Sequence, residues 1–519
     1  MSDFSKFRAD YDMSRESRYD RRRTGLAPQG NTADWHYRVE EQYYRDMEKA
    51  RDMARNDSII GQTTDRAVTN VVQGGFTLNP NTGSKPLDRE LKARWDEWSQ
   101  DPDMCSISGE HCWHDFEIMS LRSCIVDGDF TALAIESGHL QPIEAHQIRT
   151  SQRQENTFLG VTKNAYGRHE QVWIRKDAIT PSEGREQSSP VNVRNNSGLR
   201  TVFQVYDPKR FSQTRGVTAY APIFSIAGML DDLQFAALVK QQVTSCFTVF
   251  RERDGDLTAP HAIPNYGEQR TESTVYGGTR QLDGIAPGME ILGEPGEKLS
   301  GFSPGVPGEQ FFPHVNMLLN IIGVNLGLPL CLVMMDGSQT NFSGWRGAVD
   351  EARKGWSLQQ DMLIKRLHMP VYRWKVAQWM AEDVILRDAA KRDSVNINRH
   401  SWTAPAWPYI NPKEDAEADA LQISSGLTSP RRKHAERGKD WDVISTEIVE
   451  DNLNAIDKAK KAADRINKKY GDDQPVHWRE LINMPLPDGV QMQMMDSVPG
   501  EETQVEGESI NAPEEESDS

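Results

Sequence analysis

One pentapeptide has the spacing of a serine-hydrolase motif. Residues 301–305 read GFSPG, which matches Gly-x-Ser-x-Gly with Ser303 as the nucleophile. In that motif the backbone N–H after the serine stabilises the oxyanion, but here Pro304 follows and has no N–H. The match also lies in a glycine- and proline-rich stretch, whereas the motif requires a turn between a strand and a helix. The sequence therefore predicts no hydrolase site at Ser303.

Residues that could bind metals or nucleotides do not form a recognisable site either. The stretch EHCWHDFE brings together His111, Cys112 and His114, with Cys105 upstream, but zinc sites draw their ligands from separate pairs. The five cysteines form no CxxC pair and are odd in number, so reduced thiols are expected. No GxxxxGK followed by Ser or Thr is present, which excludes a P-loop motor. We predict no catalytic residue, no metal and no cofactor.

A polar, glycine-containing stretch stands directly before a long helical pattern. It comprises Met335, Asp336, Gly337, Ser338, Gln339, Thr340, Asn341, Phe342 and Ser343. The side chains of Gln339, Thr340 and Asn341 can form transient hydrogen bonds with phosphate oxygens, without a charge that would hold a nucleic acid. A plain polar turn facing solvent is the alternative. Two nearby cations, Arg346 and Lys354, are candidates for DNA contacts or for ion pairs between subunits.

The N-terminal half alternates between helical and β-rich patterns. After an arm rich in arginine and aspartate, apolar residues at helical spacing predict a helix over 34–55, one from Asp57 to Gly74, and one over 105–127. Short β-rich runs between turn residues predict a small, mostly antiparallel sheet region over 128–207. The polar segment 181–198 within it is predicted to be a surface loop.

Long helices are predicted for the C-terminal half. About 30 residues from Pro222 onward lack another proline, which corresponds to ~45 Å of helix. A glycine- and proline-rich segment, 254–307, follows, with strand candidates at 274–277 and 289–292. A second helix precedes the polar stretch, and the third helix should kink near Arg366 because Pro370 removes one backbone hydrogen bond. Further helices are predicted from Pro412 to before Gly426, from Ser429 to Gly438, and over 441–470.

The charge and hydropathy of the chain limit the kinds of molecule that it is expected to bind. The chain has 77 Asp and Glu against 60 Lys and Arg, a formal net charge of −17. Eight of the acids lie between Glu501 and Ser519, a segment without Lys or Arg whose composition is typical of disorder. The mildly acidic remainder does not suit a protein that wraps DNA tightly, although it would let a duplex slide. Because no run of 18 apolar residues and no signal peptide are found, we expect no membrane partner and assembly in the host cytoplasm.

Four longer motifs occur in a characteristic order. They are ARNDSIIGQTTDRAVTNVVQGG, DPKRFSQTRGVTAYAPIF with its long helix, NLGLPLCLVMMDGSQTNFSGWRGAVDEARKGW, and NPKEDAEADALQISSGLTS. Together they resemble the portal proteins of tailed bacteriophages, of the lambda-family type, over roughly residues 30–470. The resemblance implies an α+β, mainly helical portal fold with wing, stem, clip and crown regions.

The resemblance also implies a division of the chain. The expected regions are a flexible arm (1–29), a wing (30–221, with the β region 128–207), a first stem helix (222–252), a clip (253–307), a second stem helix (308–327), a tunnel loop with a long kinked wing helix (328–412), a helical crown (413–470) and a disordered acidic tail (471–519).

What such a protein would do follows from the same resemblance. It would form a ring, usually of 12 subunits, at one capsid vertex of the virion, through which double-stranded DNA is packaged and ejected. The terminase large subunit would dock on the clip, 253–307, the major capsid protein would contact the wing, and a head-tail adaptor would attach to the ring. Residues 335–343 would hang into the channel, and the ring itself would have no enzymatic activity. Another phage head or connector protein, or a hydrolase or nuclease, are the alternatives.

Overall fold

We describe the fold from a computed structural model of the chain. The structure describes residues 40–150, 156–175, 188–251, 270–273, 279–282, 289–292, 308, 310–338, 340–392, 394–408, 411–439, 441–470 and 476–481. Two compact units are formed, Met1–Lys439 and Asp440–Ser519, and each is described by itself. Both the predicted arm, 1–29, and residues 482–519 of the predicted tail lie outside the described residues. Helices predominate over several small sheets, which confirms the predicted mainly helical α+β fold class.

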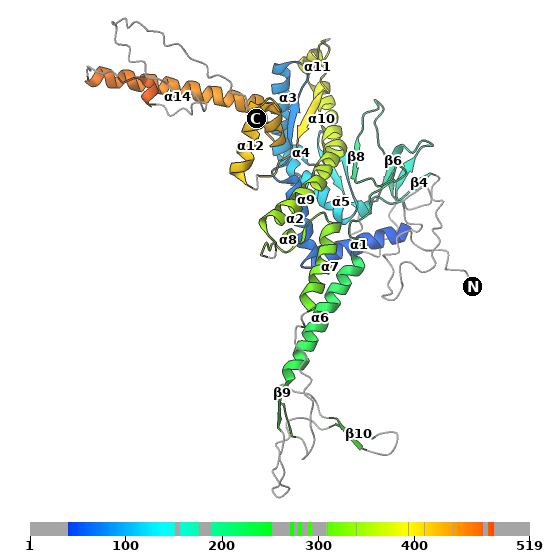
Figure 1. Ribbon diagram of the computed structural model, residues 1–519. Helices are drawn as coiled ribbons and strands as arrows, with labels where there is room; N and C mark the ends of the chain where they lie inside the picture. Colours follow the sequence, from blue (N-terminus) through cyan, green and yellow to red (C-terminus); the bar gives the residue numbers. More distant parts are fainter. Residues whose placement is uncertain are drawn as a thin grey trace, which may run out of the picture. The chain divides into compact units, whose positions relative to one another are not determined.

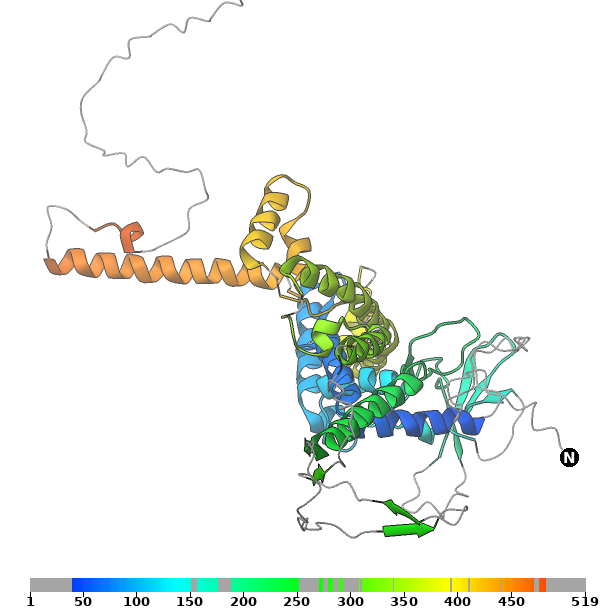
Figure 2. The ribbon, with the colours of Figure 1, turned by 60° about the horizontal axis from the view of Figure 1, so that its bottom comes forward.

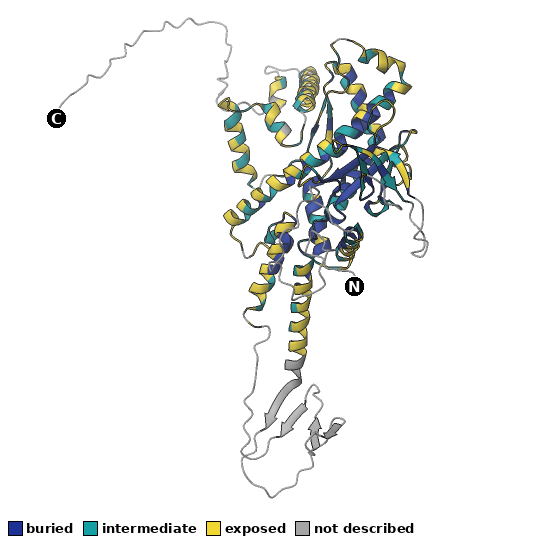
Figure 3. Ribbon diagram, turned by 90° about the vertical axis from the view of Figure 1, so that its right-hand side faces the viewer, coloured by how far each residue is buried: buried dark blue, intermediate teal, exposed yellow. Residues whose placement is uncertain are grey.

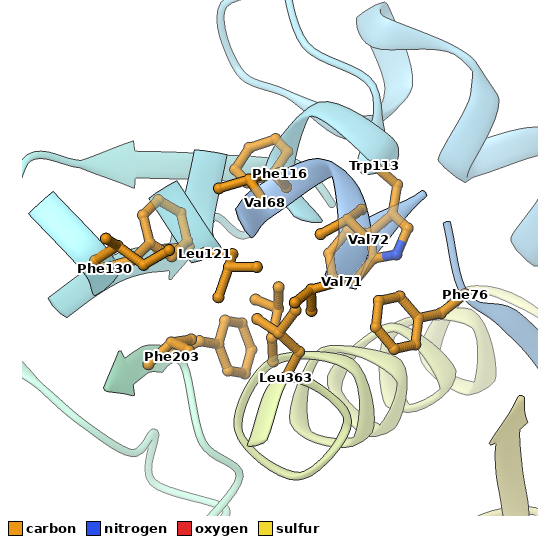
Figure 4. Close-up of a cluster of buried hydrophobic side chains, with 14 of the residues drawn as sticks. Val68, Val71, Val72, Phe76, Trp113, Phe116, Leu121, Phe130, Phe203 and Leu363 are labelled. Carbon is orange, nitrogen blue, oxygen red and sulfur yellow. The ribbon is translucent and has the colours of Figure 1, made fainter. Parts of the chain in front are cut away.

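Helices from both ends of unit 1 enclose one apolar core. The N-terminal helices are α1 (Glu40–Asn56), α2 (Ile60–Val72), α3 (Lys85–Gln100), α4 (Pro102–Cys105) and α5 (Trp113–Val126). The later helices are α9 (Phe342–Leu363), α10 (Met369–Glu382) and α11 (Val384–Ala390). In Figure 4, Val68 and Val71 of α2 meet Phe116 of α5 and Leu363 of α9, and all four are fully or almost fully buried. This packing holds segments almost 300 residues apart in one body.

The helix predicted over 105–127 is shorter in the structure. Residues 106–112 form a turn between α4 and α5, in which Gly109 has a φ of +69°. Such a left-handed conformation suits glycine and interrupts a helix. The helical run therefore begins only at Trp113, after Cys112.

Two antiparallel sheets and one isolated strand pair complete the body of unit 1. The three-stranded sheet has the order β3-β2-β8 (Leu140–Ile143, Asp129–Ala134, Val202–Tyr206). The four-stranded sheet has the order β4-β5-β6-β7 (Thr157–Phe158, Val161–Lys163, His169–Ile174, Ser189–Asn192). β1 (Thr77–Pro80) pairs with β13 (His400–Thr403). The prediction of a plain surface loop over 181–198 is wrong for residues 189–192, because these pair with β6.

Two helices lie side by side and project from this body. They are α6 (Phe224–Cys246) and α7 (Phe311–Asn325), and Figure 1 shows α6 leading to β9. β9 (Phe247–Arg251) pairs in parallel with β12 (Met289–Leu292), and β10 (Arg270–Ser273) pairs antiparallel with β11 (Thr279–Leu282). α6 is shorter than the predicted helix because the chain turns into a strand at FTVF, where aromatic and β-branched residues favour extended backbone. The strand candidate 289–292 coincides with β12, while 274–277 lies outside the described residues.

The long helical run after residue 341 contains a local irregularity. α9 passes into a π-turn, η5 (Ile364–His368), before α10 begins at Met369. Pro370 has no N–H, so the carbonyl of Arg366 loses its usual partner, and a wider turn accommodates the loss. The irregularity therefore falls where the proline predicted it.

Three further helices lie close to the bounds predicted for them, and a fourth, short helix was not predicted. In unit 1, α12 spans Pro412–Ser424 and α13 spans Pro430–Glu436. Unit 2 contains α14 (Trp441–Tyr470), which is one continuous helix in Figure 2, and the short helix η6 (Trp478–Leu481). The segment expected as a single crown, 413–470, is thus divided between the two units.

Candidate functional site

The candidate site is a surface loop between two helices of unit 1. α8 (Leu330–Val333) ends before it, and α9 begins after it at Phe342. Every described residue from Met334 to Gly344 is exposed, and Gln339 lies outside the described residues. We call residues 334–341 the exposed loop.

Local hydrogen bonds shape the exposed loop. The Asp336 carboxylate accepts a hydrogen bond from the Ser338 backbone N–H at 2.8 Å, and this bond lowers the pKa of Asp336. The Thr340 N–H donates to the Gly337 carbonyl at 3.1 Å. Met335 has a φ of +53°, which a residue with a side chain rarely adopts. The loop therefore contains a hydrogen-bonded turn in which the Asp336 carboxylate is stabilised in its negatively charged form.

The N-terminus of α9 fixes the far end of the loop. The Asn341 side chain accepts a hydrogen bond from the Gly344 N–H at 2.7 Å and caps the helix. Phe342 and Ser343, which the sequence grouped with the loop, therefore belong to the first turn of α9. Both remain exposed.

The exposed side chains are less uniformly polar than the sequence suggested. Met335 is 75% exposed and Phe342 is 57% exposed, and both are larger than the polar residues between them. Ser338, Thr340 and Asn341 supply hydroxyl and amide groups on the same stretch. The arrangement can offer apolar contact, neutral hydrogen bonding and one carboxylate, but no cation.

The two cations proposed for DNA or subunit contacts both have partners within the chain. Arg346 pairs with Asp415 of α12 at 3.0 Å. Lys354 pairs with Glu351, one turn earlier on α9, at 2.5 Å. Arg346 therefore connects α9 to α12, whereas Lys354 is largely exposed and forms a surface pair of small energetic weight.

The helices on either side of the loop are anchored to the body by side chains that sequence reasoning missed. Arg66 of α2 donates to the carbonyls of Leu332, at 3.2 Å, and of Val333 at the end of α8. On α9, the Trp356 indole N–H donates to the Gly327 carbonyl at 3.1 Å. Gln360 donates to the Val71 carbonyl of α2 at 2.9 Å. The exposed loop is thus carried by a fixed frame.

A buried ion pair fixes the segment that leads into α6. The Arg215 guanidinium binds both oxygens of Asp129 at 2.7 Å and also donates to the carbonyls of Ala145, at 2.7 Å, and Ile148, at 2.9 Å. Neither side chain of the pair is exposed. Burial alone lowers the pKa of Arg215, but the Asp129 carboxylate outweighs it and raises that pKa above its usual range. The only signal in the sequence was an arginine in an otherwise uncharged run before a long helix.

A second buried carboxylate lies between two histidines. Glu117 of α5 bonds to His368 of the π-turn at 2.7 Å and to His114 at 3.1 Å, and the Phe76 N–H donates to it at 3.4 Å. Burial opposes ionisation of Glu117, but the two histidine contacts lower its pKa. The hydrogen bond that the Glu117 carboxylate accepts from His114 raises the pKa of His114. This cluster joins α5 to the start of α10.

The candidates for catalysis and metal binding are not brought together. Cys105 is buried, which raises the pKa of its thiol, and His114 is engaged by Glu117. Across the described ranges, no three His, Cys, Asp or Glu side chains are grouped closely enough to hold a metal ion. Cys105, Cys112, Cys124 and Cys331 are free thiols. Ser303 lies outside the described residues.

Within the part of the chain that the structure describes, no helix combines the length and the apolar character needed to cross a bilayer.

Unit 1 thus combines a projecting helical pair, small sheets and an exposed loop before a long helix, and its described residues contain no cluster of side chains that could hold a metal ion. Residues 20–360 match the family described as phage portal protein, lambda family. The chain is also 19% identical over 448 residues to the portal protein of Escherichia phage N15, covering 79% of this chain and 84% of that protein. It is 21% identical over 474 residues to the probable portal protein of Halomonas phage phiHAP-1, covering 85% and 86% respectively. The chain belongs to the lambda family of phage portal proteins, which are structural proteins and not enzymes.

Proposed function

We propose that this chain forms a closed ring at one capsid vertex and that the ring is the channel for DNA packaging and exit. Membership of the portal family supports the channel, and the exposed loop is the observation that supports its inner lining. The helices that flank the loop are anchored to the body and the loop carries no cation, so it can touch a duplex without holding it. A ring of Asp336 carboxylates would repel the phosphates and keep the duplex moving.

The other expected partners are assigned to regions of the chain by their order in the sequence. We assign the segment at the end of α6, residues 253–307, to docking of the terminase large subunit. The N-terminal helices and sheets, residues 30–221, are assigned to the major capsid protein. A head-tail adaptor would attach to the assembled ring after packaging. These assignments rest on the order of the regions along the chain and on the family.

Electron microscopy of the purified protein, classified without imposed symmetry, tests the ring. We expect closed rings, with 12 subunits as the leading expectation, around a hole that admits duplex DNA, which is ~20 Å wide. The exposed loop should project into that hole. Monomers or dimers without an axial hole would overturn the proposal.

A packaging assay tests the loop itself. Replacing residues 336–340 with a Gly-Ser linker of equal length should leave the ring intact and lower the rate of DNA packaging by terminase. The charge reversal Lys413→Glu, on exposed α12, is the matched control and should leave the packaging rate unchanged. Unchanged packaging by the loop variant would remove the loop from the mechanism while leaving the ring standing.

A further inference from the structure

The long helix of unit 2 changes the sign of its charge halfway along. Its first part, 441–457, carries acids alone among its charged residues, and its second part, 458–470, carries bases with one acid. The acids are Asp442, Glu447, Glu450, Asp451 and Asp457, and the bases are Lys458, Lys460, Lys461, Arg465, Lys468 and Lys469, with Asp464 between them. The helix dipole favours this order only within the first and last turns, so it does not explain the charges in the middle.

Acids of the first part and bases of the second part are separated by a fixed interval. Asp442, Glu447, Glu450 and Asp451 are each followed 18 residues later by a base: Lys460, Arg465, Lys468 and Lys469. Eighteen residues are five helical turns, or ~27 Å. Two copies of α14 in parallel register would therefore place like charges together. A copy displaced by about half the helix would place acids beside bases.

Apolar exposure differs between the two halves as well. On the acidic half, Ile448 is 47%, Val449 is 55% and Leu453 is 61% exposed. On the basic half, Ala459 and Ala463 are buried. The acidic half therefore presents an apolar surface to solvent, whereas part of the basic half is covered.

The cover on the basic half comes from residues 476–481. The Asn467 side chain forms two hydrogen bonds with the Val476 backbone, at 2.9 and 3.1 Å, and Lys460 lies 5.5 Å from the centre of the Trp478 ring. A pocket of about 350 Å³ remains there, lined by Ala463 and these residues among others. Its lining includes the apolar side chains of Val476 and Trp478 together with Lys460 and Asp464, so it offers both apolar contact and charged groups to a neighbouring segment.

We propose that the acidic half of α14 in one copy docks on the basic half of α14, with residues 476–481, in a second copy. The contact joins two different surfaces, so each copy can bind one neighbour on each side, and such contacts close into a ring when the rotation fits. The inference deepens the proposed ring and rests on it. It assigns one neighbour-to-neighbour contact to unit 2.

Isotope-mixed cross-linking of the full chain tests this contact. Copies labelled with ¹⁴N and ¹⁵N are assembled together and treated with a carbodiimide, which joins carboxylates to amines that touch. We expect mixed-isotope links between the acids at 447–451 and the lysines at 458–469. The inference is overturned if mixed links are absent, or if those lysines are joined instead to acids of the segment 482–519 or only within one copy.

Charge-reversal variants test the pairing through the yield of a cross-link between two residues that are themselves unchanged. Glu447→Lys with Glu450→Lys, or Arg465→Glu with Lys468→Glu, should each lower the yield of the Asp451–Lys469 link about tenfold, because attraction becomes repulsion at two pairs. Combining all four substitutions should restore the yield, whereas the exposed α12 control Lys413→Glu should not change it. Failure of the combined variant to restore the link would count against the charge pairing.

The same samples separate this inference from the proposed function. Rings seen by microscopy without mixed α14 links would overturn the contact and leave the ring in place. Absence of rings in the wild-type sample would overturn the proposed function itself.

Discussion

At the scale of single residues, a buried charge depends on having a partner for each of its hydrogen-bonding groups. Arg215 uses both terminal nitrogens and Nε on Asp129 and on main-chain carbonyls, and it connects β2 to the segment that enters α6. Removing one partner from such a pair leaves the other charge buried and unpaired. The orientation of α6 relative to the body should therefore depend on this pair.

We expect Asp129→Ala to lower the free energy of unfolding by ~3–5 kcal/mol, because the Arg215 guanidinium would remain buried without its carboxylate. Chemical denaturation followed by circular dichroism measures the loss. The matched control is Asp52→Ala, which removes an exposed partner of Arg55 and should cost less than ~1 kcal/mol. Equal effects of the two substitutions would show that the buried pair is not a special contact.

The His114–Glu117–His368 cluster should make stability depend on pH. The pKa of His114 is raised above its ordinary 6.5, so its contribution is complete below that value and is lost as the pH rises through the folded-state pKa. The pKa of Glu117 is lowered below its ordinary 4.5, so its contribution is present above that value and is lost on acidification. The cluster therefore contributes most between about pH 4.5 and 6.5.

Denaturation midpoints at about pH 5.5 and about pH 8 test this pH dependence. His114→Gln should reduce the loss of stability between the two pH values. The control His314→Gln changes an exposed histidine on α7 and should leave the difference as in the wild type. A wild-type pH dependence retained by His114→Gln would refute the role of the cluster.

At the scale of elements, the beginning of α9 decides how firmly the exposed loop is held. Asn341→Ala removes the side chain that accepts from the Gly344 N–H and should destabilise the first turn of α9 by ~1 kcal/mol. Amide hydrogen exchange over residues 342–346 should become faster. Asn341→Asp keeps an acceptor and adds a negative charge at a helix N-terminus, so it should exchange as slowly as the wild type or more slowly. Identical exchange in all three proteins would exclude the cap as a restraint on the loop.

The sequence predicted those helix ends that nearby residues determine, and it missed the strand that depends on a distant partner. Proline at the first turn and glycine shortly after the last gave the ends of α12 and α13 almost to the residue, and the helical pattern over 441–470 gave α14. Pro370 likewise indicated the irregularity at η5. The conversion of α6 into β9 was missed because an apolar run can be either helix or strand, and pairing with β12, some 40 residues later, decides between them.

For the candidate site, the sequence indicated where the exposed loop lies but not which residues hold its flanking helices. The position of the exposed loop followed from a run of polar residues and glycine before a helical pattern, and its residues 335–338, 340 and 341 are exposed. Its frame could not be predicted, because Arg66 and Gln360 find their partners about 270 and 290 residues away in the sequence. The distance between partners also concealed Arg215 and Asp129.

At the scale of the whole molecule, the pair α6 and α7 has an apolar surface that a single chain leaves bare. Phe235 is 69% and Leu238 is 60% exposed on α6, while Phe312 is 60% and Val324 is 70% exposed on α7. Figure 3 shows both helices mainly in the colour of exposed residues away from the body. A groove of about 490 Å³ between them is lined by Leu233, Phe311 and Met317 among others. Contiguous exposed apolar surface of this kind marks a protein interface.

In the proposed ring, neighbouring copies would cover this surface, so its loss should affect assembly more than folding. We expect Phe235→Glu combined with Leu238→Glu to shift the sedimentation of the purified protein from rings to monomers. Neither side chain is buried in one chain, so the midpoint of chemical unfolding at low protein concentration should change little. Gln234→Glu is the matched control, because it adds a charge at an exposed position on the same helix without removing apolar surface. Rings that survive the double substitution would show that α6 does not contribute to the contact, and monomers in the control would show that charge alone prevents assembly.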